Sequence, residues 1–253
     1  GYTEVGEEFN PEVGFLSRSG FKKPEFLIWK QWRPKNSGKF LEVRPHIAYR
    51  GYWNFQNIQE TGFLHVDNHW VWESGFEIHT GINFTRETVL SPFSISNVTV
   101  DIGQYDHQEL QFVLITNHNK KLYFQNRTFI GGYFGGNRIS SRNTANFRLG
   151  DKFNTEGVLN YNRLKLPNGD ANVFITGARL SYSFTPRMFL QSLVQYNNVS
   201  NITSVNARFG WLRNANTGLF VVINVIKDTD YLDALNNQSI TIKYSHQFDL
   251  LQK

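Results

Sequence analysis

Apolar and polar residues alternate with a period of two along most of this chain. Residues 41–53, 64–73 and 76–84 carry aliphatic or aromatic side chains at nearly every second position, and histidine, arginine and carboxylate side chains fill most of the positions between them. Because the side chains of an extended chain point alternately to its two faces, each segment predicts a strand with one apolar and one polar face. No segment has convincing helical periodicity, so the pattern predicts an all-β protein.

Thirteen strands are predicted from these runs and from the turn residues that separate them. They cover residues 25–33, 40–53, 62–73, 75–87, 105–117, 120–132, 143–153, 156–166, 172–184, 187–197, 204–213, 218–226 and 238–250. Residues 1–24 are expected to be an irregular leading segment, and 25–253 to form one β-domain.

The last predicted strand, 238–250, indicates a location. Its apolar face carries Ile240, Ile242 and Tyr244, and polar residues stand between them. About ten residues of this pattern is the length of a strand that crosses an outer membrane in a closed barrel. Four residues near its end resemble the C-terminal signal that outer-membrane barrels present to their assembly machinery, with serine in place of the usual glycine: Lys243, Ser245, Phe248 and Leu250.

The connections between predicted strands also alternate in length. Those at 73–75, 117–119, 152–155, 185–186 and 214–217 are short, and those at 88–104, 133–142 and 227–237 are longer. Outer-membrane barrels have short periplasmic turns and long external loops, so the alternation favours such a barrel. Thirteen strands is an odd number, whereas single-chain bacterial barrels have an even one. A further strand is therefore expected in 1–24 or before residue 1, unless one has been miscounted.

Composition is compatible with this interpretation. The 253 residues include 15% aromatics and no cysteine, and the formal charge is +5. No run approaches eighteen apolar residues, which excludes a helical membrane span. The absence of cysteine excludes disulfides and thiolate metal sites, and the scattered basic residues argue against a nucleic-acid partner. The expected fold is an antiparallel transmembrane β-barrel of about 13–14 strands in the outer membrane of a Gram-negative bacterium.

Two stretches carry a family resemblance. They are Glu8-Phe-Asn-Pro-Glu-Val-Gly-Phe-Leu-Ser-Arg18, and residues 181–197 continuing through 206–211 to 219–224. Together they resemble the C-terminal barrel region of an uncharacterised family of outer-membrane proteins that carry an N-terminal carbohydrate-binding-type β-sandwich. The sandwich and an upstream barrel segment have no counterpart here, and the acidic start of the chain is not a signal peptide. The resemblance implies that the chain is the C-terminal part of a larger barrel, and it implies no catalytic residues.

A histidine cluster is the sharpest candidate site. Four histidines fall on the predicted polar faces of three consecutive strands, with carboxylates among them: His46, His65, His69 and His79, with Asp67, Glu73 and Glu77. A tight turn over 73–75 would place His69 directly across from His79, and the preceding hairpin would bring His46 beside His69. Cross-strand neighbours have Cβ atoms about 5 Å apart, so such imidazoles can share a metal. We expect a hydrogen-bond network that fills the lumen without a cofactor. The alternative hypothesis is a divalent metal at His46, His69 and His79.

Six cationic residues form a second group that is expected to line the lumen. They are Arg44, Arg50, Arg148, Arg179, Arg208 and Lys243. In an open pore they would favour anions. In a filled lumen they would pair with Glu42, Asp67, Glu77 and Asp249, and we favour pairing because these carboxylates are interspersed among them.

The expected function is a non-enzymatic channel, or a binding or scaffold component that handles glycan-like ligands or partner outer-membrane proteins. The glycan preference rests on the family resemblance alone. One alternative is an outer-membrane hydrolase with a rim or lumen site, in which an Asp–His pair activates water. Such a pair would come from the predicted long connections, which hold Asp101, Asp106, His107, Asp228, Asp230 and Asp233. Another is a structural subunit of a larger envelope complex. Expected partners are outer-membrane lipid and lipopolysaccharide, the barrel assembly machinery and other outer-membrane or periplasmic proteins, but no nucleic acid.

Overall fold

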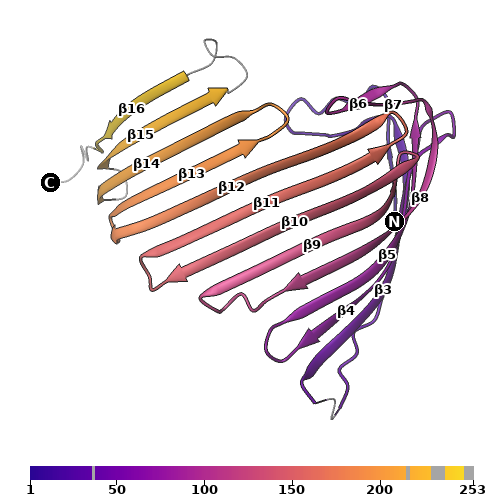
Figure 1. Ribbon diagram of the computed structural model, residues 1–253, viewed down its shortest axis with the longest axis horizontal. Helices are drawn as coiled ribbons and strands as arrows, with labels where there is room; N and C mark the ends of the chain where they lie inside the picture. The colour runs from indigo at the N-terminus through magenta and orange to yellow at the C-terminus, as the bar shows by residue number, and fades with distance from the viewer. Residues whose placement is uncertain (36–37, 215–216, 229–236, 248–253) are drawn as a thin grey trace. The chain divides into compact units, whose positions relative to one another are not determined.

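The computed structural model describes residues 1–35, 38–214, 217–228 and 237–247, and within them it is all-β, without a helix (Figure 1). Fourteen strands form one antiparallel sheet in chain order, and β6 and β7 form a separate hairpin. The strands are β1 (Tyr2–Val5), β2 (Phe21–Trp29), β3 (Phe40–Trp53), β4 (Gln59–Trp72), β5 (Glu77–Val89), β6 (Phe93–Ile95), β7 (Val98–Val100), β8 (Gly103–Ile115), β9 (Leu122–Tyr133), β10 (Gly136–Leu149), β11 (Phe153–Leu166), β12 (Gly169–Thr185), β13 (Met188–Asn197), β14 (Ile202–Asn214), β15 (Thr217–Asp228) and β16 (Asn237–Ser245).

The strand that alternation missed in the large sheet is β1. It lies in the segment 1–24 that was expected to be irregular, and it pairs with β2 from Tyr2 opposite Pro24 to Val5 opposite Phe21. β2 itself begins four residues before the predicted start at 25. The sheet therefore has an even number of strands among the described residues. It is not closed, because β1 and β16 each have a hydrogen-bonded neighbour on one side only.

One of the expected long connections is wrong, and another contains two short strands. Residues 133–142 do not form a loop, because β9 and β10 are joined by the two-residue turn Phe134–Gly135. Both turn residues have positive φ (43° and 76°), as in the primed turns that suit the twist of a hairpin. Between β5 and β8 the connection is long but contains β6 and β7. Most of the third, 227–237, lies outside the described residues. The alternation of short and long connections is therefore weaker than expected.

The chain divides into two compact units. Unit 1 comprises Gly1–Asn117, Asn126–Ser141 and Asn162–Asn172, and unit 2 comprises His118–Gln125, Arg142–Tyr161 and Val173–Lys253. Every buried hydrophobic residue found among the described residues belongs to unit 1, from Phe21 and Val71 to Val113 and Ala171. The apolar side chains described in unit 2 retain more solvent exposure.

Each unit has a face of apolar side chains in cross-strand register. In unit 1 one row runs across β2, β3, β4, β5 and β8 through Ile28, Ile47, Val66, Ile82 and Leu110. In unit 2 a similar row crosses β12 to β16 through Tyr182, Leu190, Phe209, Val221 and Ile242. The rows are exposed at several positions, with 62% exposure at Leu110 and 69% at Ile242. None of the described residues forms a helix long and apolar enough to span a membrane.

Candidate functional site

The densest group of ionisable side chains lies on the opposite, polar face of β3, β4 and β5 in unit 1. The register places His69 directly across from His79, as the sequence predicts. His46 lies directly across from Asp67 and diagonally beside His69, whose direct cross-strand neighbour on β3 is Arg44. Because residues two apart on a strand share a face, Asp67 lies between His65 and His69 on β4 and becomes the centre of the cluster.

The Asp67 side chain is completely buried and only partly satisfied. Its Oδ2 accepts a 3.0 Å hydrogen bond from Gln111 Nε2, and it lies 3.4 Å from His65 Nε2 and 3.5 Å from His69 Nε2. Its Oδ1 has no hydrogen-bond partner. Gly81, its neighbour on β5, leaves the space that Asp67 occupies, since a Cβ there would lie 3.0 Å from Asp67 Cγ.

The imidazoles approach one another closely around this carboxylate. The ring centre of His46 lies 5.1 Å from that of His65 and 4.9 Å from that of His69, and the rings of His69 and His79 stack in parallel at 3.5 Å. Two groups have potential ligand atoms within 4.8 Å of one another: His46, His65 and Asp67, and Asp67, His69 and His79. The predicted trio of His46, His69 and His79 is split between these groups. His65 and Asp67 were absent from it, although the alternation places them on the same face.

A second layer of buried polar groups holds His65. Asn83 is fully buried, its Nδ2 donates to Glu109 Oε1 at 3.1 Å, and its Oδ1 lies 2.6 Å from His65 Nδ1. Arg138 donates to the other oxygen of Glu109 from Nε at 3.2 Å and from Nη2 at 2.8 Å. A chain of contacts therefore runs from the Arg138 guanidinium to the His65 ring. Its members come from β4, β5, β8 and β10.

Further ion pairs surround the cluster in unit 1. The buried Glu42 is bonded to Arg44, to Gln31 and, at 2.9 Å, to Arg33. Glu77 lies 3.1 Å from His79 Nε2. Arg44 thus has the carboxylate partner that the pairing hypothesis expects. Arg50 instead lies over the ring of Phe63, with its guanidinium carbon 4.6 Å from the ring centre.

The other predicted lumen cations lie in unit 2 and have different surroundings. Arg179, Arg208 and Lys243 occupy β12, β14 and β16, on the face opposite the apolar row. Arg208 lies over the rings of Phe220, at 4.7 Å, and Phe189, at 5.7 Å. Arg148, near the end of β10, donates to the backbone oxygen of His118 at 2.8 Å. Among the described residues, no carboxylate lies within ion-pair distance of these four predicted cations.

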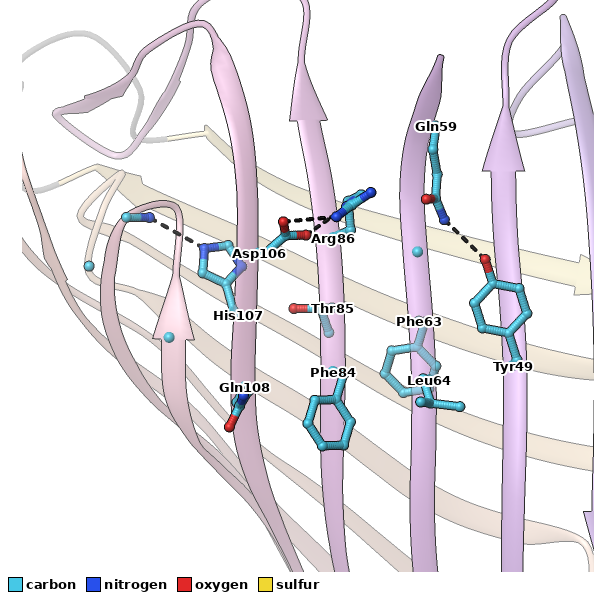
Figure 2. A pocket seen from close by; sticks show the side chains of 14 residues that line it. Tyr49, Gln59, Phe63, Leu64, Phe84, Thr85, Arg86, Asp106, His107 and Gln108 are labelled. Atoms are coloured by element: carbon cyan, nitrogen blue, oxygen red, sulfur yellow. Dashed lines mark hydrogen bonds and ion pairs between the residues drawn. The ribbon is translucent and has the colours of Figure 1, made fainter. Parts of the chain in front are cut away.

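Asp106 and His107, two of the residues considered for a hydrolase, do not pair with each other. Asp106 and His107 lie in β8 rather than in a connection, and as consecutive strand residues they point to opposite faces. Figure 2 shows the Arg86 guanidinium and the Asp106 carboxylate turned toward each other, joined at 2.6 and 2.9 Å. His107 Nε2 accepts a hydrogen bond from the Gly135 backbone nitrogen at 3.3 Å. Asp230 and Asp233 lie outside the described residues.

Half of the predicted assembly signal can be located. Lys243 and Ser245 lie in β16, while Phe248 and Leu250 fall outside the described residues. Comparison of the chain with protein-family models, with curated proteins and with solved structures finds no match.

Proposed function

We propose that the chain is a β-barrel protein of the bacterial outer membrane, or part of one, and that it acts as a channel or as a binding or scaffold component. The observation that carries this proposal is the pair of exposed apolar rows, one in each unit. A soluble monomer rarely exposes a contiguous apolar patch larger than a few hundred Å². In a bilayer the same side chains would contact lipid, and the polar face would turn to the lumen.

The limits of the apolar face in unit 1 support this location. Beyond the row through Val66 lies a row with aromatic side chains at Phe26, Tyr49 and Phe84, and beyond that the Arg86–Asp106 ion pair. At the other end, Phe40 and Phe76 contact Trp72. Flanking aromatic residues of this kind resemble the two girdles of an outer-membrane barrel.

The height of the band between these aromatic groups fits a bilayer. Leu64 and Trp72 lie on the same face of β4, eight residues apart. At about 3.3 Å per residue they are separated by about 26 Å along the strand. A strand tilt of about 40° reduces this to about 20 Å along the barrel axis, near the apolar band of about 25 Å in known barrels.

Glycan-like ligands and partner outer-membrane proteins remain part of the proposal through the family resemblance. A hydrolytic pair of Asp106 and His107 is not part of the proposal, because consecutive strand residues point to opposite faces. Lipid, lipopolysaccharide and the barrel assembly machinery are the partners that an outer-membrane location requires.

The proposal is tested by placing a charge on each part of one strand face. Leu110 and Gln104 occupy the same face of β8, Leu110 within the apolar band and Gln104 beyond it. In phospholipid vesicles we expect Leu110→Arg to reduce the free energy of unfolding by about 2–4 kcal/mol, and Gln104→Arg by about 0–1 kcal/mol. Denaturant titration monitored by tryptophan fluorescence measures both. Equal, small effects, together with a parent chain that stays soluble without lipid, would rule out the membrane proposal.

A further inference from the structure

The Asp67 carboxylate has the properties of a ligand without its ion. It is fully buried, and one of its two oxygens has no hydrogen-bond partner. A buried carboxylate is unfavourable unless it is paired, hydrogen-bonded or bound to a metal. The Gln111 amide satisfies part of Oδ2, but nothing found among the described residues satisfies Oδ1. The group therefore needs a positive partner.

The hydrogen bonds of the second layer determine which nitrogen of His65 faces Asp67. The Asn83 amide nitrogen donates to Glu109, so its oxygen is the atom that faces His65 Nδ1. Nδ1 must therefore carry a proton and donate it. In a neutral ring Nε2 then has a lone pair, and this lone pair lies toward the carboxylate. These two electron-rich atoms can face each other only with a positive charge between them, either a proton on Nε2 or a bound cation.

His46 is prepared in the same way. Its Nδ1 lies 3.2 Å from the backbone oxygen of Arg44, which can only accept a hydrogen bond. The Nδ1–H of His46 is therefore engaged, and its Nε2 remains as the ligand atom. A histidine that binds a metal through one nitrogen and donates the other N–H to an oxygen is the usual arrangement in metal sites.

The spacing of the ligand atoms fits a tetrahedral ion better than it fits a hydrogen bond. His65 Nε2 and Asp67 Oδ2 are 3.4 Å apart, beyond the usual 2.7–3.2 Å of an N–H···O bond. Ligands held about 2.0–2.1 Å from a tetrahedral zinc ion lie about 3.3–3.4 Å from one another. A potential ligand atom of His46 lies within 4.8 Å of those of His65 and Asp67, so the three residues surround one point.

We propose that His46 Nε2, His65 Nε2 and the Asp67 carboxylate bind a divalent first-row transition metal, with at least one coordination position left open. Two imidazoles and a carboxylate suit zinc and its neighbours, whereas magnesium and calcium prefer oxygen ligands alone. The second group is the weaker candidate. His79 Nε2 is already engaged by Glu77, and the parallel stack with His69 does not direct two nitrogens to one point.

The ligand set is tested with Zn²⁺ and Co²⁺ on the full chain. Titration calorimetry of the metal-free protein should give one Zn²⁺ per chain, and Co²⁺ should give the intense visible absorption of a tetrahedral site. We expect His46→Ala, His65→Ala and Asp67→Asn each to weaken binding by at least the 10–100-fold that loss of an outer-shell group costs. His107→Ala, which removes a histidine outside the cluster, should bind as the parent does.

Two further variants separate the proposal from its competitors. Asn83→Ala removes the partner of His65 Nδ1 without removing a ligand, so it should weaken Zn²⁺ binding about 10–100-fold. His79→Ala should retain binding, and loss of binding in that variant but not in His46→Ala would overturn the ligand set. No stoichiometric binding by a folded parent, checked by circular dichroism, would overturn the site itself. The two proposals can fail separately. Zn²⁺ titration tests the metal site, and the Leu110→Arg comparison, made without added metal, tests the membrane location.

Discussion

The polar faces of the two units follow the same sequence pattern but differ in how their charges are compensated. Every ion pair found among the described residues joins two residues of unit 1. In unit 2, Arg179, Arg208 and Lys243 share their face with hydroxyl and amide groups, and Asn206 and Asn224 bond to each other across β14 and β15. The same alternation thus supports an ionic network in unit 1, and in the described part of unit 2, which does not include Asp249, a face whose predicted cations have no carboxylate partner.

The difference arises from where the carboxylates lie. The strands of unit 1 place Glu42, Asp67 and Glu109 at buried positions of the polar face. A buried charge requires a partner, so arginine and histidine side chains gather around these groups. On the polar face of β12 to β16 the described residues include no such buried carboxylate. The cations there need no protein partner as long as water or anions reach them.

The largest expected effect breaks the network of unit 1. Glu109→Ala leaves Arg138 and Asn83 without their shared partner, and breaking a buried ion pair costs about 3–5 kcal/mol. Arg208→Gln in unit 2 removes a cation that has no carboxylate partner among the described residues. It should reduce the free energy of unfolding by much less than Glu109→Ala does. Denaturant unfolding of both variants in the same vesicles makes the comparison. Similar losses would mean that compensation of charge is not what distinguishes the two faces.

A second prediction tests the property that the units share. Ile242 and Thr241 are consecutive residues of β16, and Ile242 belongs to the apolar row of unit 2. If that row contacts lipid, Ile242→Arg should lower stability in vesicles by about 2–4 kcal/mol, and Thr241→Arg on the polar face should have little effect. Unfolding followed by fluorescence provides the measurement. A larger loss of stability in Thr241→Arg than in Ile242→Arg would mean that the face of Thr241, and not that of Ile242, contacts lipid.

The third prediction concerns the space beside Asp67. A methyl group at Gly81 would meet the Asp67 side chain, so Gly81→Ala should cost about 1–3 kcal/mol, as overpacking does. It should also weaken the Zn²⁺ affinity of the proposed site. The matched control is Gly157→Ala in unit 2, where a Cβ would meet nothing within 4 Å. That variant should be neutral or slightly stabilising. Thermal unfolding and zinc titration of both variants distinguish the two positions, and an unchanged zinc affinity in Gly81→Ala would speak against the site.

Alternation predicts the strands well where one face of the strand is apolar and the other is polar. The predicted segment 40–53 coincides with β3, whose two faces differ sharply. β10 begins at Gly136, seven residues before the predicted start at 143. The prediction starts too late because Ser141 and Asn143 occupy positions where an apolar residue would mark the outward face. The turn before it was missed because phenylalanine rarely adopts the positive φ found at Phe134.

The candidate site was predictable only in part for a related reason. Alternation assigns His46, His65 and Asp67 to one face, but it does not determine which residue lies opposite which. The orientation of His65 depends on its contact with Asn83 and on the contact of Asn83 with Glu109. These contacts join residues that are 18 and 26 positions apart in the chain. Such contacts follow from the register and from the insertion of β6 and β7, neither of which leaves a periodic signal.

The smallest expected effect concerns the ion selectivity of the two polar faces. If the chain forms an open pore, the cations of unit 2 should favour anions, whereas Arg44 in unit 1 is neutralised by Glu42. The double change Arg179→Gln and Arg208→Gln should therefore lower the ratio of anion to cation permeability, by roughly two-fold. Arg44→Gln should lower that ratio less. Reversal potentials in planar bilayers under a potassium chloride gradient measure the change. A parent that conducts without anion preference would mean that the unit 2 cations are compensated by something other than permeating ions, such as a bound acidic ligand, and a parent that does not conduct would favour a scaffold over a channel.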